Sequence, residues 1–256
     1  MFMKIIIPCY NVGDTIGRML DSILAQTFTD YHIVCVEDCS TDNTWDVLQS
    51  YKEKNPDKMT LIKNPHNMGP GETRNRGYFM TADSLPSEFI WMVDGDDYLA
   101  DNDVLLRISS HCASQGLSKQ AKMVYVGISK GGKFVQSGTN YPIGPYGAVV
   151  RQGYFVSYRR ENLQGCEDVY QHLVQIDSVE PDEISYIDSI CYVMEKMGFH
   201  RVRSKVGTSF KFMSKLISSL KFKQRHTLVA LKFVDDIWRK YHHRPLVVGA
   251  RPSTIS

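Results

Sequence analysis

Short apolar runs alternate with helical patterns through the first hundred residues, and this alternation constrains the fold more than any other feature. Four runs have the length of a buried parallel strand, at residues 4–7, 32–36, 59–62 and 89–93. Between the first two runs, Ile16, Leu20 and Ile23 recur at the spacing of one helical face. Because alternating strands and helices form βαβ units, we expect an α/β fold with a mainly parallel central sheet flanked by helices.

Unusual polar residues follow three of these runs. Residues 8–11 follow the first run, residues 37–38 the second and residues 94–97 the fourth. Right-handed crossovers bring the carboxyl ends of parallel strands to one rim of the sheet, where open α/β sheets bind their ligands. The sequence therefore predicts one cleft that collects these polar residues.

The segment Asp94-Gly95-Asp96-Asp97 gathers three carboxylates around one glycine. Carboxylates at the end of a buried strand repel each other and are costly to desolvate, and a cation relieves both costs. Oxygen ligands suit hard divalent ions, and glycine allows a close backbone approach. We expect Mn²⁺ or Mg²⁺ here, in a site that serves to bind a phosphate. A polar turn with capping aspartates is the structural alternative.

The turn that begins at Asn67 has the features of a phosphate-binding loop. Gly69 and Gly71 precede a predicted helix that carries Arg74, and helix N-termini attract anions. The turn is neither a Walker A sequence nor a GxGxxG motif, so ATPase and nicotinamide-binding functions lose their usual support.

The pattern changes after residue 120. Residues 123–128 and 133–135 are expected to form a hairpin around Gly131-Gly132. Residues 137–153 are rich in Gly, Pro and Tyr and predict a loop over the cleft. Glu167-Asp168 is expected to begin a further helix.

Charge divides the chain unevenly. Of its 256 residues, 201–256 hold 13 Lys/Arg against 2 Asp/Glu, while residues 1–200 hold 17 against 26. We therefore expect a globular domain over 1–200 and a basic helical C-terminal extension over 201–256. Within the extension, residues 211–244 predict either a peripheral contact with an anionic membrane or a helix packed on the core with a solvated basic edge. No recognisable nucleic-acid module accompanies the charge, so nucleic acid is not an expected partner.

The N-terminus, the length of the apolar runs and the cysteines indicate where in the cell the protein is expected. The apolar N-terminus is too short for a secretory signal, and no apolar run reaches the length of a membrane span. The six cysteines show no paired zinc spacing and are expected to be reduced thiols. We therefore expect a cytoplasmic protein, with peripheral membrane association if residues 211–244 bind lipid.

Four separated motifs, taken together, resemble those of the family 2 glycosyltransferases, which have the GT-A (Rossmann-like) fold. In family order they read IIIPCYNVGDTIGRMLDSILAQTFTDYHIVCVEDCSTDNT at 5–44, NMGPGETRNRG at 67–77, FIWMVDGDDYL at 89–99 and GCED at 165–168. The resemblance covers roughly residues 4–175. It implies a metal-dependent, inverting transfer of a sugar from a nucleotide sugar, expected to be a UDP-sugar. The acceptor would be a hydroxyl of a glycan, a lipid-linked molecule or a protein.

The resemblance assigns the nucleotide side of the cleft residue by residue. Pro8, Tyr10 and Asn11 fall where the family's first loop lines the nucleotide. Asp38 matches the carboxylate that reads the base, and Glu37 stands beside it where an aspartate is more usual. This pair of carboxylates also fits the start of a helix cap, which is the structural alternative.

The remaining assignments concern the diphosphate and the sugar. Asp96 would hold the metal. Asp94, beside Gly95, would contact the ribose or donor sugar and share the metal. Asn67 and Arg74 would lie near the donor. The resemblance thus implies a nucleotide-sugar half over residues 1–100 and an acceptor half over 101–200.

The catalytic base would come from the acceptor half. Asp168, or else Glu167, matches the carboxylate that deprotonates the acceptor, and an N-cap is the structural alternative. His200 is the nearest histidine to serve the metal or diphosphate, although a surface histidine on a basic segment fits it as well.

Two other functions fit parts of the pattern. A nucleotidyltransferase shares the α/β sheet and acidic metal site, but it usually has a basic, glycine-rich loop after its first strand, unlike residues 8–11. A non-catalytic nucleotide-sugar-binding module is the other alternative, and the retained carboxylates argue against it.

Overall fold

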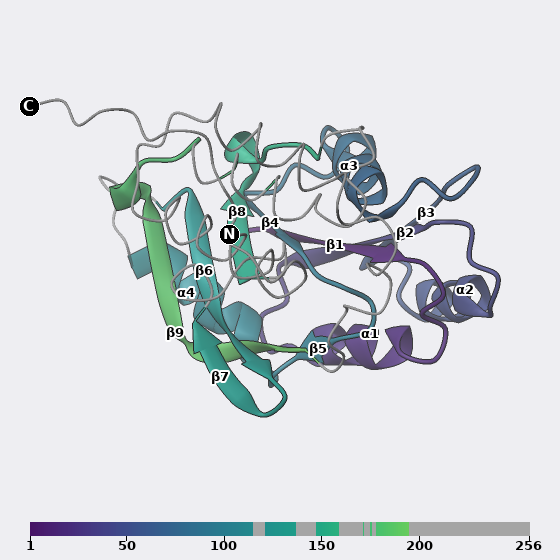
Figure 1. Ribbon diagram of the computed structural model, residues 1–256, viewed down its shortest axis with the longest axis horizontal. Coiled ribbons are helices and arrows are strands. Elements are labelled where there is room, and N and C mark those ends of the chain that lie inside the picture. Colours follow the sequence, from purple (N-terminus) through teal and green to yellow (C-terminus); the bar gives the residue numbers. More distant parts are fainter. Residues whose placement is uncertain (115–120, 137–146, 159–170, 172–174, 176–177, 195–256) are drawn as a thin grey trace, which may run out of the picture.

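A nine-stranded mixed sheet runs through the described part of the chain in the computed structural model (Figure 1). The structure describes residues 1–114, 121–136, 147–158, 171, 175 and 178–194. Across the sheet the strands follow the order β3 (Met59–Lys63), β2 (Tyr31–Glu37), β1 (Met3–Cys9), β4 (Phe89–Met92), β8 (Ala148–Arg151), β6 (Met123–Lys130), β9 (Ile184–Met194) and β5 (Tyr98–Leu99). A ninth strand, β7 (Lys133–Gln136), pairs with β6 as the predicted hairpin.

The direction of the strands differs between the two sides of the sheet. Strands β3, β2, β1 and β4 are parallel, as the βαβ pattern predicted. β6 and β9 are also parallel, whereas β8 runs antiparallel between β4 and β6, and β5 runs antiparallel to β9. The α/β fold with flanking helices is therefore confirmed, with antiparallel strands added on one side.

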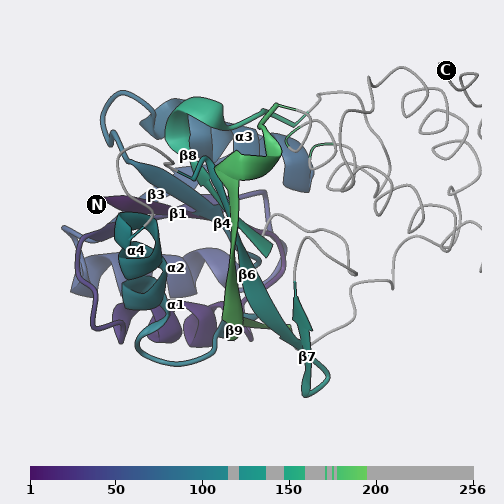
Figure 2. The same ribbon diagram turned by 90° about the vertical axis from the view of Figure 1, so that its left-hand side faces the viewer.

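Helices cover both faces of this sheet, as Figure 2 shows. On one face lie α1 (Ile16–Leu24), α2 (Thr44–Lys54) and α4 (Val104–Ser114), and on the other lies α3 (Pro70–Thr81). Short 3₁₀ turns occur at Gln152–Tyr154 and Pro181–Glu183. Because successive side chains of a strand point to opposite faces, Ile5 and Ile7 pack with α1, while Ile6 packs beneath α3.

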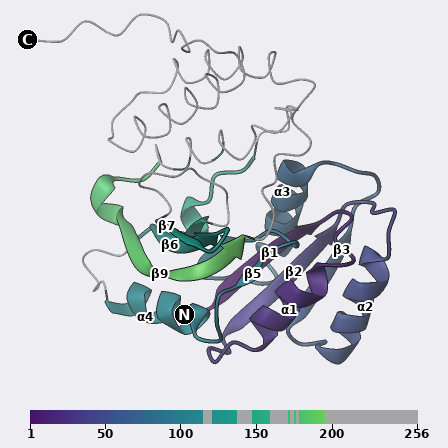
Figure 3. The same cartoon turned by 60° about the horizontal axis from the view of Figure 1, so that its bottom comes forward.

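The first two helices lie side by side against the parallel strands (Figure 3). The Tyr51 hydroxyl of α2 donates to Asp21 Oδ1 of α1 at 2.7 Å. Burial, together with the Asp21 carboxylate, raises the pKa of Tyr51 to about 12, so the phenol keeps its proton. This contact fixes the two helices whose preceding loops reach the carboxyl rim of the sheet.

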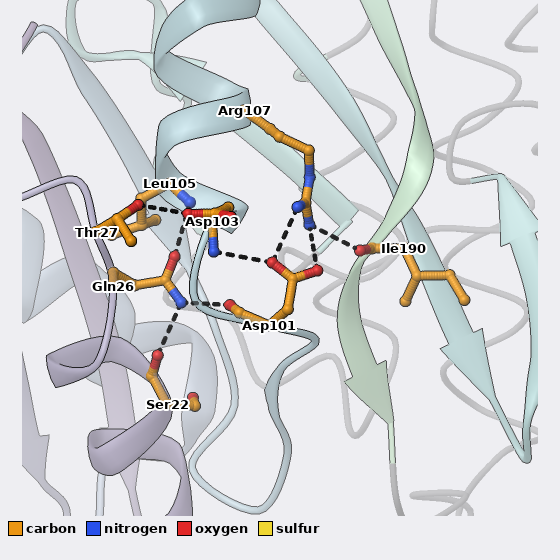
Figure 4. A network of polar contacts seen from close by, with 8 residues as sticks. All are labelled: Ser22, Gln26, Thr27, Asp101, Asp103, Leu105, Arg107 and Ile190. Carbon is orange, nitrogen blue, oxygen red and sulfur yellow. Dashed lines mark hydrogen bonds and ion pairs between the residues drawn. The ribbon is translucent and has the colours of Figure 1, made fainter.

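A polar network holds the chain where it leaves the carboxyl rim and turns into α4 (Figure 4). The Gln26 side chain donates to Asp101 O at 2.6 Å and accepts from Leu105 N–H at 2.9 Å. Arg107 makes two bonds of 2.9 Å to the Asp101 carboxylate and a third, of 3.2 Å, to Ile190 O on β9. Because Gln26 also donates to Ser22 O of α1 at 2.9 Å, the network joins α1, α4 and β9.

Several elements differ from the expectations. Residues 148–151 form strand β8 instead of part of a loop, because their apolar side chains are largely buried between β4 and β6. The helix α4 and the strands β5 and β9 were not predicted, although Val104, Leu105 and Ile108 carry a helical spacing.

Some expectations fall outside the described residues. They concern the loop at 137–146, Glu167, Asp168, His200 and the extension at 201–256, so the domain boundary at residue 200 stays a prediction. In the part of the chain that the structure describes, no helix combines the length and apolarity needed to cross a membrane.

Candidate functional site

A pocket of about 430 Å³ opens at the carboxyl rim of the parallel strands. This volume falls within the range of roughly 300–1,000 Å³ that is usual for small-molecule sites. Three strand ends and one helix start contribute its lining: Pro8, Cys9, Tyr10, Val12, Asp38, Asn67, Gly69, Pro70, Thr73, Arg74, Asp94, Gly95 and Asp96. The fold therefore brings polar residues that lie far apart in the sequence into one cleft, as predicted.

The acidic turn after β4 forms one wall of this pocket. Arg74 on α3 donates to Asp94 Oδ1 at 2.6 Å. The Arg74 side chain is 3% exposed and that of Asp94 is 29% exposed, so the ion pair sits at the boundary between the core and the pocket. Arg74 also lies over the Tyr158 ring, 5.4 Å from its centroid. The arginine is therefore held in place from two sides.

Residues of α1 and its N-cap also hold the acidic turn. The Thr15 hydroxyl donates to Gly95 O at 3.2 Å, and Arg18 donates to Asp96 O at 3.0 Å. A Cβ atom on Gly95 would lie 3.2 Å from Ile16 Cδ1, which is tighter than an ordinary van der Waals contact. A glycine therefore suits this position because α1 packs closely against the turn.

A residue of strand β9 that the sequence analysis missed also supports the turn. Tyr192 on β9 is fully buried, and its hydroxyl donates to Asp97 Oδ2 at 2.8 Å while it accepts from Asp94 N–H at 3.0 Å. Burial raises the pKa of Tyr192, and the carboxylates of Asp94 and Asp97 raise it further, so the phenol keeps the proton that it donates. Only the alternation of an apolar strand marks Tyr192 in the sequence.

The Asp38 carboxylate organises the glycine turn. Its Oδ1 accepts from Asn64 Nδ2 and from Met68 N–H, both at 2.7 Å, and its Oδ2 accepts from Gly69 N–H at 2.9 Å. An ionised carboxylate offers about four acceptor positions. These three bonds therefore leave room for one further donor at Asp38, on a side chain that lines the pocket.

The glycine turn leads into the N-terminus of α3. Gly69 has a φ of +80°, a left-handed conformation that favours glycine, and Pro70 occupies the first turn of the helix. Helix N-termini carry partial positive charge and amide N–H groups without intrahelical partners. The pocket thus has both an acidic wall and a helix N-terminus suited to anions.

Two predicted residues, Asn11 and Glu37, do not line the pocket. Asn11 Oδ1 accepts from Thr41 N–H at 2.8 Å, which ties the loop after β1 to the loop after β2. Glu37 is buried and accepts from Ser40 N–H, and its Oε2 finds no hydrogen-bond partner among the described residues. In this structure Glu37 supports the loop after β2, whereas the N-cap residue of α2 is Asn43, so Glu37 does not cap that helix.

The other predicted residues divide into two groups. Eight line the pocket: Pro8, Tyr10, Asp38, Asn67, Arg74, Asp94, Gly95 and Asp96. Glu167, Asp168 and His200 lie outside the described residues. The other lining residues had no individual role assigned from the sequence, but all of them lie within the motifs at 5–44 and 67–77; they are Cys9, Val12, Gly69, Pro70 and Thr73.

The chemistry of the acidic wall fits a divalent cation that a substrate helps to bind. Among the described residues, no group of three or more His, Cys, Asp or Glu side chains is arranged to hold a metal by itself. Asp94 and Asp96 supply carboxylate oxygens at the pocket. Mg²⁺ is usually bound by one or two carboxylates together with substrate phosphates and water, so two carboxylates suffice for such a site.

The sequence matches one family model and is similar to a glucosyltransferase of Bacillus spizizenii. Residues 4–115 match the family model described as glycosyl transferase family 2. Over 109 residues, 42% of this chain, the sequence is 38% identical to the poly(ribitol-phosphate) beta-glucosyltransferase of Bacillus spizizenii. The aligned part spans only 16% of the length of that relative.

Two solved structures share the fold. TarS 1–349 from S. aureus in complex with UDP-GlcNAc aligns with a TM-score of 0.72 and 19% identity, over 94% of this chain and 74% of TarS 1–349. The mannosyltransferase PcManGT from Pyrobaculum calidifontis, in complex with GDP-Man and Mn²⁺, aligns with a TM-score of 0.52 and 15% identity, over 90% and 63% of the two chains. At these identities the likeness shows a common fold, and it confirms the expected GT-A architecture.

Proposed function

Residues 4–115 match the model of glycosyl transferase family 2, and on that premise we propose that this chain is a member of the family and transfers a sugar from a nucleotide sugar to a hydroxyl acceptor. A UDP-sugar is the proposed donor. The observation that carries this proposal is the single pocket in which Asp38, the N-terminus of α3 and the Asp94–Asp96 wall converge. Those three parts match the base, the diphosphate and the metal of a nucleotide-sugar complex.

Asp38 is the proposed reader of the base. Its fourth acceptor position is suited to the imide N–H of a uracil ring, since the other three are occupied by Asn64, Met68 and Gly69. Pro8 and Tyr10 line the same part of the pocket and would contact the nucleotide. TarS, which shares the fold, holds UDP-GlcNAc in its own structure, and this supports a uridine donor.

The proposed metal site consists of Asp96 and Asp94. Bound there, Mn²⁺ or Mg²⁺ would neutralise charge on the leaving diphosphate. PcManGT, of similar fold, was solved with Mn²⁺ and a sugar nucleotide, which supports a divalent ion in this role. Arg74, which is paired with Asp94 at 2.6 Å, holds that carboxylate in place at the pocket.

The catalytic base is proposed to be Asp168, with Glu167 beside it as the alternative; both lie outside the described residues. The base would take the proton of the acceptor hydroxyl as that oxygen attacks the anomeric carbon from the side opposite the diphosphate, which inverts the configuration. General bases of this kind contribute about 10²–10⁴-fold to the rate. A glycan or a polyol-phosphate polymer is the proposed acceptor, because the Bacillus spizizenii relative is named for such a polymer.

The test is calorimetric binding of UDP in the presence of Mn²⁺, for the wild type and for Asp96→Asn. We expect the variant to bind UDP at least about tenfold more weakly, because it loses a charged metal ligand. Asp83→Asn, at an exposed aspartate that does not line the pocket, is the matched control and should bind as the wild type does. Equal UDP affinity in wild type and Asp96→Asn would contradict the proposed metal ligand.

A further inference from the structure

Tyr192 lies nearly one hundred residues after the acidic turn, yet its hydroxyl touches both ends of that turn. The phenol oxygen accepts from Asp94 N–H at 3.0 Å and donates to Asp97 Oδ2 at 2.8 Å. Asp97 is only 3% exposed and does not line the pocket. The phenol thus bridges the first residue of the turn, which faces the pocket, and the last, which faces the core.

The direction of these bonds is fixed by chemistry. An amide N–H is only a donor, so the phenol oxygen must accept from Asp94, and the phenol hydrogen then points to the Asp97 carboxylate. A hydrogen bond to an ionised acceptor is stronger than one between neutral groups. Because Tyr192 and Asp97 are both buried, water does not compete well for either bond.

The other supports of the turn act at different atoms. Thr15 and Arg18, both on the α1 side, hold the carbonyls of Gly95 and Asp96. Tyr192 instead reaches the turn from β9 and holds the Asp94 amide, within the same buried cluster that contains the apolar residues of α1. The ring itself is anchored near Trp91 of β4, with centroids 6.1 Å apart.

We propose that Tyr192 is a positioning residue that sets the orientation of the Asp94 and Asp96 carboxylates through the Asp94 amide and the Asp97 carboxylate. It contacts neither the donor nor the metal. The inference rests on the proposed function, because the orientation of the turn matters for a metal held between two carboxylates and a diphosphate. It assigns to strand β9 an indirect part in the donor site, which the pocket lining does not reveal.

The first test needs no ligand. In Tyr192→Phe the ring stays and only the hydroxyl is lost, so the Asp94 amide should exchange its hydrogen about tenfold faster than in the wild type. Tyr125→Phe is the matched control, because Tyr125 on β6 is also a fully buried tyrosine, stacked on Tyr186 at 5.4 Å, and does not line the pocket. The control should leave exchange at Asp94 unchanged. Unchanged exchange in Tyr192→Phe would overturn the inference.

The second test measures Mn²⁺ in the presence of saturating UDP by electron paramagnetic resonance. We expect Tyr192→Phe to bind Mn²⁺ about tenfold more weakly than the wild type and Tyr125→Phe to bind it equally well. Faster exchange with unchanged Mn²⁺ affinity would overturn the positioning role and leave Tyr192 a purely structural residue. A wild type that binds neither UDP nor Mn²⁺ would instead refute the proposed function, so the two failures are distinguishable.

Asp97→Asn provides a second variant in case Tyr192→Phe does not fold. It weakens the same pair of bonds from the other end, because a neutral amide oxygen is a poorer acceptor for the phenol than a carboxylate. We expect faster exchange at the Asp94 amide in this variant as well, and exchange at the wild-type rate would contradict the inference. In the double variant the two effects on exchange should be less than additive, because the residues act through one contact.

Discussion

At the scale of single residues, the most unusual side chain outside the pocket is Lys4. It is fully buried in β1, and its Nζ donates to Thr81 O at 2.8 Å, near the end of α3. Burial disfavours the charged form and lowers the pKa of Lys4 to about 8. The amine therefore serves as a hydrogen-bond donor to a helix carbonyl, and its charge opposes folding.

This lysine predicts a pH dependence of stability. The unfolded chain keeps the proton on Lys4 up to about pH 10, whereas the folded chain releases it near pH 8, so the unfolded state binds more protons between these values. The contribution of Lys4 to the free energy of unfolding should therefore rise from pH 7.5 to pH 10. Urea denaturation of the wild type and Lys4→Met at both pH values measures it. A difference between the two proteins that is independent of pH would contradict the assignment.

At the scale of elements, the close approach of α3 to the sheet determines where Arg74 and the N-terminus of the helix lie. Gly77 makes this approach possible, since a Cβ atom there would lie 2.7 Å from Ile6 Cγ2 and 2.9 Å from Val36 Cγ2. Neither methyl group can move freely, because both residues belong to the buried cluster beneath α3. Gly77, three residues after Arg74, thus allows α3 to pack closely on the sheet.

Gly77→Ala should therefore destabilise the protein by about 1–3 kcal/mol, as overpacked core positions do. On an exposed helix the same change usually stabilises by about 1 kcal/mol, so the sign of the effect reports the packing. Chemical denaturation followed by circular dichroism measures it. Gly153→Ala is the control, because no atom lies within 4 Å of its added Cβ, and a gain in stability at Gly77 would contradict the account.

At the scale of the whole molecule, the sequence was most informative where local patterns suffice. The parallel strands β1 to β4 follow from apolar runs, and Asp38, Asp94 and Asp96 follow from their place directly after such runs. Each of these features is contained in about ten consecutive residues. That is why the pocket could be predicted before its geometry was known.

Features that depend on distant contacts could not be predicted in the same way. Tyr192 looks like any core residue of a strand, and only the pairing of β9 with β5 and β6 brings it to the acidic turn. Strand β8 was expected to be part of a loop. Its four residues form a strand because they pair with β4 and β6, which a local pattern does not show. Glu37 was expected to contact the nucleotide beside Asp38, yet the two side chains differ in position: Glu37 supports a loop, and Asp38 lines the pocket.

The whole molecule is proposed to act as a metal-dependent glycosyltransferase, and the most direct test is the release of UDP from a panel of UDP-sugars with Mn²⁺ and candidate acceptors. The wild type should release UDP from at least one donor and stop when EDTA removes the metal. Asp168→Asn should bind that donor as the wild type does but transfer its sugar about 10²–10⁴-fold more slowly, because the base acts only on the acceptor. A wild type that neither binds nor turns over any donor would contradict the central claim.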